Sequence, residues 1–261
     1  MLTFSQLKEQ YTKRNEFVSP RLVLEEYLQY ELLDSLYKQK GSEQLSFMGG
    51  TSMRICYRGN RFSEDLDFDN FGLSFAIFQL ILNGVIVDMQ QKGFSVEFRC
   101  IEKGAYHCYI KFPNLLHEHK ISDHASEKIL IKMESVQQER VYTPRVYTMN
   151  NFDLYRNLSV TPEDILLSQK LITIMQRKRT KGRDFYDVSF LYGITQPNRI
   201  YVEEKTKMSW DDFIEQLIVQ CSTLDFNVYA KEVEPFLIRK DQTMRVETFL
   251  EFIKSKKEKS V

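Results

Sequence analysis

Two aspartates, Asp65 and Asp67, alternate within the stretch DLDFDN, and their type and spacing suggest chemistry. Side chains alternate along a strand, so both carboxylates would point to the same face. Two carboxylates held this close repel each other unless a cation lies between them. Mg²⁺ prefers oxygen ligands and usually takes one or two carboxylates together with substrate phosphates. Taken alone, the pair indicates either a site for Mg²⁺ or Mn²⁺, or an exposed strand face that carries solvated acids.

A glycine turn, GGTS, precedes the aspartates and separates an apolar run from a helical pattern. The free backbone N–H groups at Gly49 and Gly50, together with the helix N-terminus, could hold a phosphate, with Thr51 or Ser52 as added donors. Any strand-to-helix turn can use glycine, so the turn alone is weak evidence. A phosphate cradle followed by a carboxylate pair on the next strand predicts a site for a nucleotide and a metal ion.

Three further residues extend this predicted site. Glu134 shares a strand face with Lys132 in KILIKMESV. If this strand lies beside the DLD strand, Glu134 completes a cluster of three carboxylates that could bind two metal ions, as nucleotidyl transfer uses them. A surface face of lysine and glutamate is the alternative interpretation. Arg61 and Ser63, in the loop before the aspartates, are candidates for phosphate contacts.

A second group of candidates lies downstream. On a helical wheel Lys170 lies at the edge of an apolar stripe, Asp184 falls within another stripe, and Asp187 lies on its flank. An acid in an apolar stripe is costly unless it is paired, so Lys170 is the expected partner. The pair would either lock two helices together or contribute to the active site, and the pattern does not choose between the two aspartates.

A basic run lies between these two helices, in the sequence QRKRTKGR. Such a run is either a solvated helix end stabilised by the helix dipole or a binding patch for the phosphates of RNA or of a triphosphate. Its members are Arg177, Lys178, Arg179, Lys181 and Arg183.

The elements that must position these residues follow from the hydrophobic pattern. Helices are predicted over residues 3–17, 20–40 and 74–91 and over TSMRICYR, and strands over LSFMGG, DLDFDN, FSVEFRCIE, YHCYIKFP and KILIKMESV. Residues 1–150 should therefore form an α/β domain with a mixed sheet. Residues 151–261 should form a helical domain that completes the active-site cleft, with the boundary in the tyrosine-rich segment 142–158. The expected fold class is α+β.

Composition excludes several classes of protein. The 261 residues carry 36 basic and 36 acidic side chains, so any nucleic acid must bind to a local patch. No apolar run approaches the roughly 20 residues of a membrane span, and the charged N-terminus does not look like a signal peptide. The four cysteines are scattered without the spacing of a zinc site, which favours a reduced, cytoplasmic setting.

The string GGTSMRICYRGNRFSEDLDF resembles the AbiEii/AbiGii branch of the DNA polymerase β-type nucleotidyltransferase superfamily, a branch that includes the MenT toxins. The usual form there is a Gly-Gly-Thr-Ala-Leu-Arg turn followed by Arg-Phe-Ser-Glu-Asp-Leu-Asp-Phe. Here Ser52 and Met53 replace alanine and leucine. The stretch LLSQKLITIMQRKRTKGRDFYDVSFL is similar to the downstream block of the family, a helix with an inward lysine followed by Arg-Asp-x-x-Asp. The resemblance spans roughly residues 45–195.

The resemblance implies a polymerase β-like fold and a metal-dependent nucleotidyltransferase that acts as the toxin of a toxin–antitoxin or abortive-infection system. Asp65 and Asp67 would hold the metal ion, Glu134 would help to activate the acceptor hydroxyl, and Lys170 would contact the triphosphate. The donor would be an NTP and the leaving group pyrophosphate. The acceptor would be RNA, such as a tRNA 3′ end, or a protein hydroxyl, and a cognate antitoxin is the expected partner. Two alternatives are a module that binds NTP or RNA without turnover, and a phosphotransferase on the same fold.

Overall fold

The computed structural model describes residues 2–14, 16 and 19–258. The chain divides into two compact units, Met1–Thr161 and Pro162–Val261, and each unit is described by itself. The predicted first helix is observed as α1 (Phe4–Lys13), and its expected end at residue 17 lies outside the described residues.

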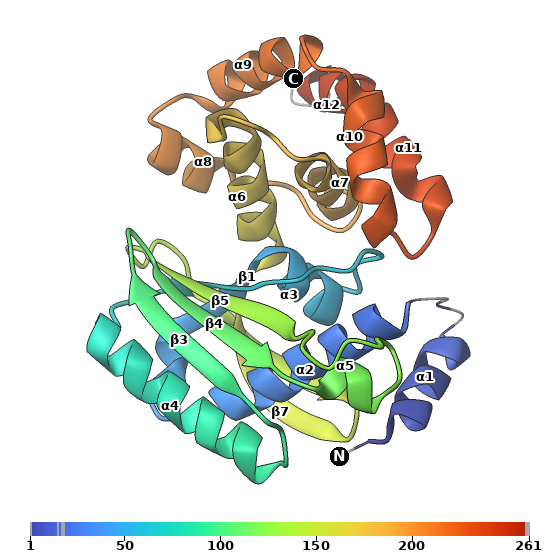
Figure 1. Cartoon of the computed structure of the whole chain (residues 1–261). Helices are drawn as coiled ribbons and strands as arrows, with labels where there is room; N and C mark the ends of the chain where they lie inside the picture. The colour runs from blue at the N-terminus through green and yellow to red at the C-terminus, as the bar shows by residue number, and fades with distance from the viewer. Residues whose placement is uncertain (1, 15, 17–18, 259–261) are drawn as a thin grey trace. The chain divides into compact units, whose positions relative to one another are not determined.

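The first unit contains a seven-stranded mixed sheet with the order β3-β4-β5-β2-β1-β7-β6 (Figure 1). Strand β2 pairs in parallel with β5, and β1 pairs in parallel with β7, whereas the other neighbours are antiparallel. The strands are β1 (Leu45–Met48), β2 (Leu66–Asn70), β3 (Glu97–Glu102), β4 (Tyr106–Phe112), β5 (Ile129–Gln137), β6 (Arg145–Asn151) and β7 (Leu154–Val160).

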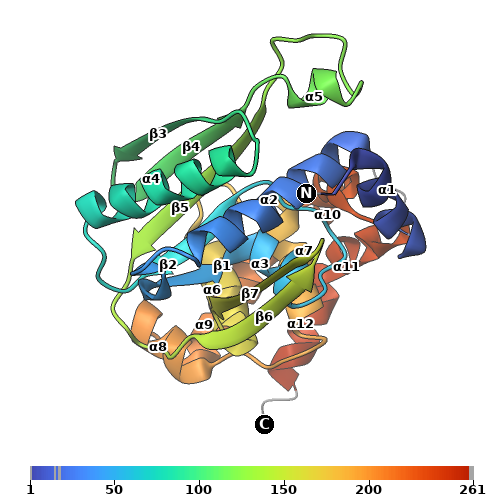
Figure 2. The ribbon, with the colours of Figure 1, turned by 90° about the horizontal axis from the view of Figure 1, so that it is seen from below.

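Two long helices, α2 (Pro20–Leu36) and α4 (Phe75–Gln91), lie along one face of this sheet (Figure 2). Helix α2 begins where the sequence predicts, because Pro20 occupies its first turn and the Ser19 side chain accepts a hydrogen bond from the Leu22 N–H at 3.3 Å. The shorter helices of this unit are α3 (Gly49–Cys56) and α5 (Leu115–Glu118), and a 3₁₀ turn spans Ser42–Gln44.

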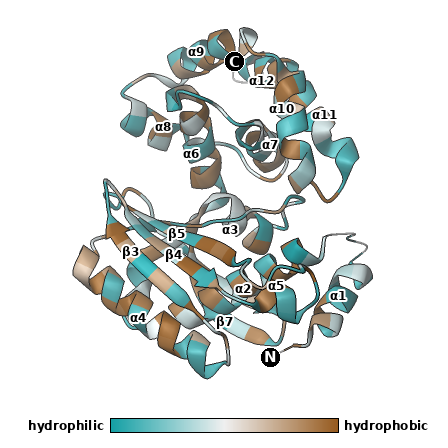
Figure 3. Ribbon diagram, viewed as in Figure 1, coloured by the Kyte–Doolittle hydropathy of each residue, from teal (hydrophilic) through white to brown (hydrophobic). Residues whose placement is uncertain are grey.

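Alternation along the strands separates a buried face from an accessible one. In β4 the residues Tyr106, Cys108, Ile110 and Phe112 are buried, while the residues between them remain at least partly accessible. Strand β5 repeats this pattern, and Figure 3 shows hydrophobic and hydrophilic residues following one another along the strands. The accessible face of β2, β4 and β5 carries polar side chains that include Asp67, His107 and Glu134.

The sequence pattern did not reveal strands β6 and β7. The segment 142–158, expected to hold the domain boundary, contains β6 and most of β7, and the chain divides into its two compact units between Thr161 and Pro162. Strand β6 lies at the sheet edge, where Met149 is its single buried residue, so it lacks the alternation that marks a half-buried strand. The turn between the strands uses Phe152 and Asp153 at φ of 54° and 60°, without the glycine that usually signals such a hairpin.

The second unit is helical, as the sequence predicts. Its α-helices are α6 (Glu163–Gln176), α7 (Gly182–Leu191), α8 (Arg199–Thr206), α9 (Trp210–Ser222), α10 (Phe226–Val233), α11 (Met244–Glu247) and α12 (Phe249–Glu258), and 3₁₀ turns span Glu234–Phe236 and Lys240–Thr243. Helices α7 and α10 approach closely at Gly182, where an added Cβ would lie 2.0 Å from the Tyr229 carbonyl oxygen. Within the described parts of both units, no helix has the length and apolar character needed to cross a membrane.

Candidate active site

The glycine turn lies directly against one of the predicted carboxylates. Strand β1 ends at Met48, and Gly49 turns the chain into α3 with φ of 78°, a conformation that favours glycine. An added Cβ at Gly49 would lie 2.3 Å from Asp67 Oδ2. The backbone at the start of α3 and the Asp67 carboxylate therefore form one continuous surface.

Arg61 and Ser63 border the same turn. An added Cβ at Gly50 would lie 2.5 Å from Arg61 Nη2 and 2.6 Å from Ser63 Oγ. The Arg61 side chain is nearly buried, and its Nη1 donates a hydrogen bond to the Phe62 carbonyl at 2.9 Å. A cation and a hydroxyl thus lie beside the N-terminal backbone of α3, an arrangement suited to phosphate oxygens.

Thr51 and Ser52 are fully buried, and their hydroxyl groups already have partners. Thr51 donates to the Asp65 carbonyl, and Ser52 donates to the Gly49 carbonyl at 3.0 Å. These contacts join the turn to the loop that carries Asp65. The structure gives both hydroxyls a positioning contact, and direct donation to a phosphate would require those bonds to break.

Gln29 of α2 supports the same loop and was not found from the sequence. Its Nε2 donates to the Ser63 carbonyl at 2.7 Å and to the Glu64 carbonyl at 3.1 Å, and the side chain is buried. A buried glutamine on a long apolar helix gives no local signal, because its partners lie more than thirty positions later in the chain.

Strand register places the predicted acids next to one another. Asp67 of β2 lies opposite Glu134 of β5, and Glu134 lies opposite His107 of β4. His107 Nδ1 is 3.2 Å from Glu134 Oε2, although it is not aligned for a hydrogen bond. His107, Glu134 and Asp67 therefore form a row across three strands, which we call the carboxylate row.

Lys132 supplies the counter-charge to this row. Its ammonium group forms an ion pair with Glu134, one step along the same face of β5. Desolvation lowers the pKa of Lys132, but the hydrogen bond and charge of Glu134, aided by the charge of Asp65, outweigh it and leave the pKa raised. Asp65, just before β2, thus contributes to the electrostatic environment of Lys132.

The predicted cage of three carboxylates is not assembled as such. Within residues 2–14, 16 and 19–258, no three His, Cys, Asp or Glu side chains gather closely enough to hold a metal ion by themselves. Glu134 instead pairs with Lys132 and lies beside His107. Mg²⁺ usually takes one or two carboxylates and completes its shell with substrate phosphates, so binding of this ion by Asp65 and Asp67 stays a prediction.

Asp69, the second aspartate on β2, has a structural contact instead. It is 1% exposed and accepts a hydrogen bond from the Tyr142 hydroxyl, which also lies 2.8 Å from Thr161 Oγ1. Burial and the charge of Asp69 raise the pKa of Tyr142, so the phenol remains protonated and keeps this bond. Asp69 therefore ties β2 to the segment between β5 and β6.

In the second unit, the structure resolves which aspartate pairs with Lys170. Lys170 Nζ lies 2.7 Å from Asp187 Oδ2, and the side chains are 14% and 0% exposed. Asp184 pairs with Arg177 and accepts a hydrogen bond from the Lys181 N–H at 3.2 Å. The first pair joins α6 to α7, whereas the second closes the loop between them. A contact between Lys170 and a triphosphate stays a prediction.

The basic run lies in and beside that loop, and most of it is accessible. In the part of the chain that the structure describes, Arg177 is the one member with an ion pair. The exposed residues are Arg177, Lys178, Arg179 and Lys181, and Arg183 is half-buried. Phosphate binding by this run also stays a prediction.

With this geometry established, comparison with known proteins decides the family. The model of the nucleotidyl transferase AbiEii toxin family, a type IV toxin–antitoxin system, matches residues 31–258. This chain belongs to the AbiEii nucleotidyltransferase toxin family. The resemblance inferred from its motifs is thereby confirmed over most of the chain.

Two solved structures share the fold of this chain and confirm the expected α+β class. MenT4, a nucleotidyltransferase toxin from Mycobacterium tuberculosis, is 16% identical with a TM-score of 0.60, covering 99% of this chain and 93% of its own. JHP933 from Helicobacter pylori is 16% identical with a TM-score of 0.53, covering 94% and 96%. No curated protein sequence matches the chain significantly.

Proposed function

We propose that this AbiEii protein is a metal-dependent nucleotidyltransferase that moves a nucleotide from an NTP to an acceptor hydroxyl, on RNA such as a tRNA 3′ end or on a protein. It would act as a cytoplasmic toxin that a cognate antitoxin neutralises. The observation that carries the proposal is the position of Asp67, whose carboxylate touches the Gly49 turn on one side and lies opposite Glu134 on the other.

Each part of the site would have a separate task. The α3 N-terminus, Arg61 and Ser63 would bind the triphosphate and orient it. Asp65 and Asp67 would hold Mg²⁺ or Mn²⁺, which when bound neutralises phosphate charge and polarises the phosphoryl group.

Glu134 would act on the acceptor. Its carboxylate would accept the proton of the acceptor hydroxyl while Lys132 holds it in place. A bond then forms between the acceptor oxygen and the α-phosphorus, the bond between the α-phosphorus and the bridging oxygen breaks, and pyrophosphate leaves. A single general base typically accelerates a reaction by about 10²–10⁴-fold, so loss of Glu134 should slow transfer by that factor without abolishing nucleotide binding.

The test is incubation of the protein with RNA, Mg²⁺ and each α-³²P-labelled NTP in turn, with Asp67→Ala as the inactive variant. Asp123→Ala is a matched control, because Asp123 is an exposed acid in the loop after α5. Label should enter the acceptor with the wild type and the control but not with Asp67→Ala, and EDTA should abolish it.

Other outcomes would point to the competing functions. Label that is transferred only from γ-³²P-labelled NTP would identify a phosphotransferase. NTP binding that does not depend on metal ions, with no labelled product from α- or γ-³²P-labelled NTP, would identify a binding module. A folded Asp67→Ala variant that remains fully toxic in cells would refute the proposed mechanism.

A further inference from the structure

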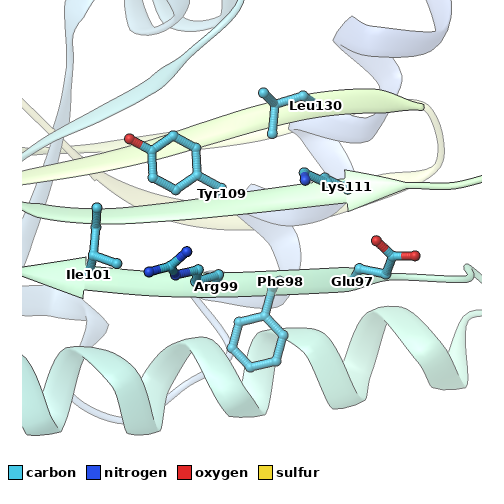
Figure 4. A pocket seen from close by; sticks show the side chains of 7 residues that line it. All are labelled: Glu97, Phe98, Arg99, Ile101, Tyr109, Lys111 and Leu130. Carbon is cyan, nitrogen blue, oxygen red and sulfur yellow. The ribbon is translucent and has the colours of Figure 1, made fainter. Parts of the chain in front are cut away.

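The outer strands of the sheet carry a second patterned surface beside the carboxylate row. Register places Arg99 opposite Tyr109 and Tyr109 opposite Lys132, so these three side chains form a row across β3, β4 and β5. The next row outward places Lys111 between Glu97 and Leu130. Figure 4 shows the side chains that line this part of the face, and Phe98 among them points instead toward α4. We call Arg99, Ile101, Tyr109, Lys111, Leu130 and Lys132 the outer-strand platform.

The platform has an excess of positive charge. Its neighbouring acid, Glu97, forms an ion pair with Lys128 at 2.8 Å. Among the described residues, Arg99 and Lys111 have no acidic side chain within ion-pair distance, and both are exposed. Glu97 lies opposite Lys111 and interacts with its charge, whereas Arg99 lies opposite Tyr109 and has no carboxylate opposite it. An exposed guanidinium of this kind favours an anionic occupant, because it suits the oxygens of a phosphodiester.

An aromatic ring and two apolar side chains lie among these cations. Tyr109 is partly accessible, with Arg99 on one side and Lys132 on the other. Leu130 is 48% exposed, and the hollow over this part of the sheet has a volume of about 520 Å³. Ring faces and cations along one groove are the combination by which proteins bind single-stranded nucleic acids, because bases stack and phosphates pair.

The platform is continuous with the proposed active site. Ile101 lies opposite His107, so the carboxylate row extends onto β3 at the edge of the platform. Tyr109 is two residues from His107 on β4, and a strand rises about 3.4 Å per residue, so the two rows are about 7 Å apart. That separation is of the order of one nucleotide step in an extended strand.

We propose that the outer-strand platform binds the acceptor, and that this acceptor is the single-stranded 3′ end of an RNA. Tyr109 stacks on a base near the end, Arg99 and Lys111 bind phosphates, and the terminal hydroxyl reaches Glu134. The proposal rests on the proposed nucleotidyl transfer and selects RNA over a protein hydroxyl as acceptor. A protein acceptor would not need a base-sized aromatic ring flanked by the cations Arg99 and Lys132.

The first test measures binding without turnover. Fluorescein-labelled single-stranded RNA is titrated with the full-length protein in the absence of NTP, and anisotropy is followed. Tyr109→Ala should weaken binding by about tenfold, and Tyr109→Phe should restore it because the ring is retained. Arg99→Ala/Lys111→Ala should weaken binding and flatten its dependence on salt concentration.

Matched controls lie elsewhere in the first unit. Tyr155 is 70% exposed on β7, so Tyr155→Ala removes an accessible ring without touching the platform. Lys8→Ala/Lys40→Ala removes two exposed lysines at other sites. Both controls should bind RNA like the wild type, and circular dichroism should show that every variant is folded.

The outcomes separate this proposal from the proposed function. RNA binding that is absent in the wild type, unchanged in Tyr109→Ala and Arg99→Ala/Lys111→Ala, or equally weakened by Tyr155→Ala would overturn the platform, even if transfer to a protein is observed. Loss of binding confined to the platform variants would support it even if no transfer occurs. Where transfer to RNA is measurable, Tyr109→Ala should raise the KM for RNA and leave the KM for NTP unchanged.

Discussion

Replacing Gly49 with alanine should misplace the Asp67 carboxylate. The added Cβ would lie 2.3 Å from Asp67 Oδ2, whereas carbon and oxygen atoms in close contact are normally about 3.3 Å apart or more. The carboxylate must therefore move by about 1 Å, a displacement that can reduce catalysis by about 10²-fold. The left-handed backbone at φ of 78° adds a stability cost of about 1–2 kcal/mol for a residue with a side chain.

A second glycine separates these two effects. Gly104, in the turn between β3 and β4, has φ of 69°, and an added Cβ there would meet nothing within 4 Å. Gly104→Ala should suffer a similar loss of stability with no displacement of a carboxylate. The measurement is kcat/KM for transfer from labelled NTP, together with the urea unfolding free energy of both variants.

We expect both variants to lose stability and Gly49→Ala alone to lose activity. If Gly49→Ala and Gly104→Ala keep the same kcat/KM while both remain folded, contact between the turn and Asp67 does not position the carboxylate for catalysis. A large loss of activity in both variants would attribute the effect to instability rather than to the site.

Three other predictions concern buried or paired groups. Lys170→Met leaves the fully buried Asp187 without its lysine and should destabilise the second unit by about 3–5 kcal/mol in urea unfolding, and an unchanged unfolding free energy would contradict this. Lys132→Met removes the counter-charge of Glu134, so added Mg²⁺ should raise the melting temperature more than in the wild type, and an equal rise would contradict this. Burial raises the pKa of Cys221 to about 12 from 9.0, so the folded unit keeps this thiol protonated and should lose stability as the pH rises above 9.0. Cys221→Val should remove that alkaline loss.

The elements with strong periodicity could be predicted from the sequence, and those at the sheet edge could not. The strands over LSFM, LDFDN and ILIKMESVQ alternate clearly, and the structure confirms each of them. Strand β6 buries only Met149, so its sequence carries no such alternation. Its pairing with β7 depends on backbone hydrogen bonds and on a turn that lacks glycine, and neither feature has a reliable local signature.

The candidate site shows a similar division. The glycine turn, Arg61, Ser63 and Asp67 come together as their motif predicts, because they lie close in sequence on a strand, a turn and the following loop. The approach of Glu134 to Asp67 depended on a strand pairing that had been assumed, and register confirms it. His107 gave no signal, since only the antiparallel pairing of β4 with β5 brings it to Glu134.

Electrostatics explains how the carboxylate row and the outer-strand platform fit on one sheet face. Glu134 and Asp67 lie opposite each other, and two like charges at that spacing would repel. The protein supplies its own counter-charge through Lys132, whose raised pKa keeps it cationic at physiological pH. Lys132 also lies opposite Tyr109, so the residue that balances Glu134 is the one that flanks the proposed base-stacking ring. An acceptor phosphate that approached Lys132 would weaken the ion pair between Lys132 and Glu134. The Glu134 carboxylate would then accept a proton more readily, so acceptor binding would be coupled to activation of the acceptor hydroxyl.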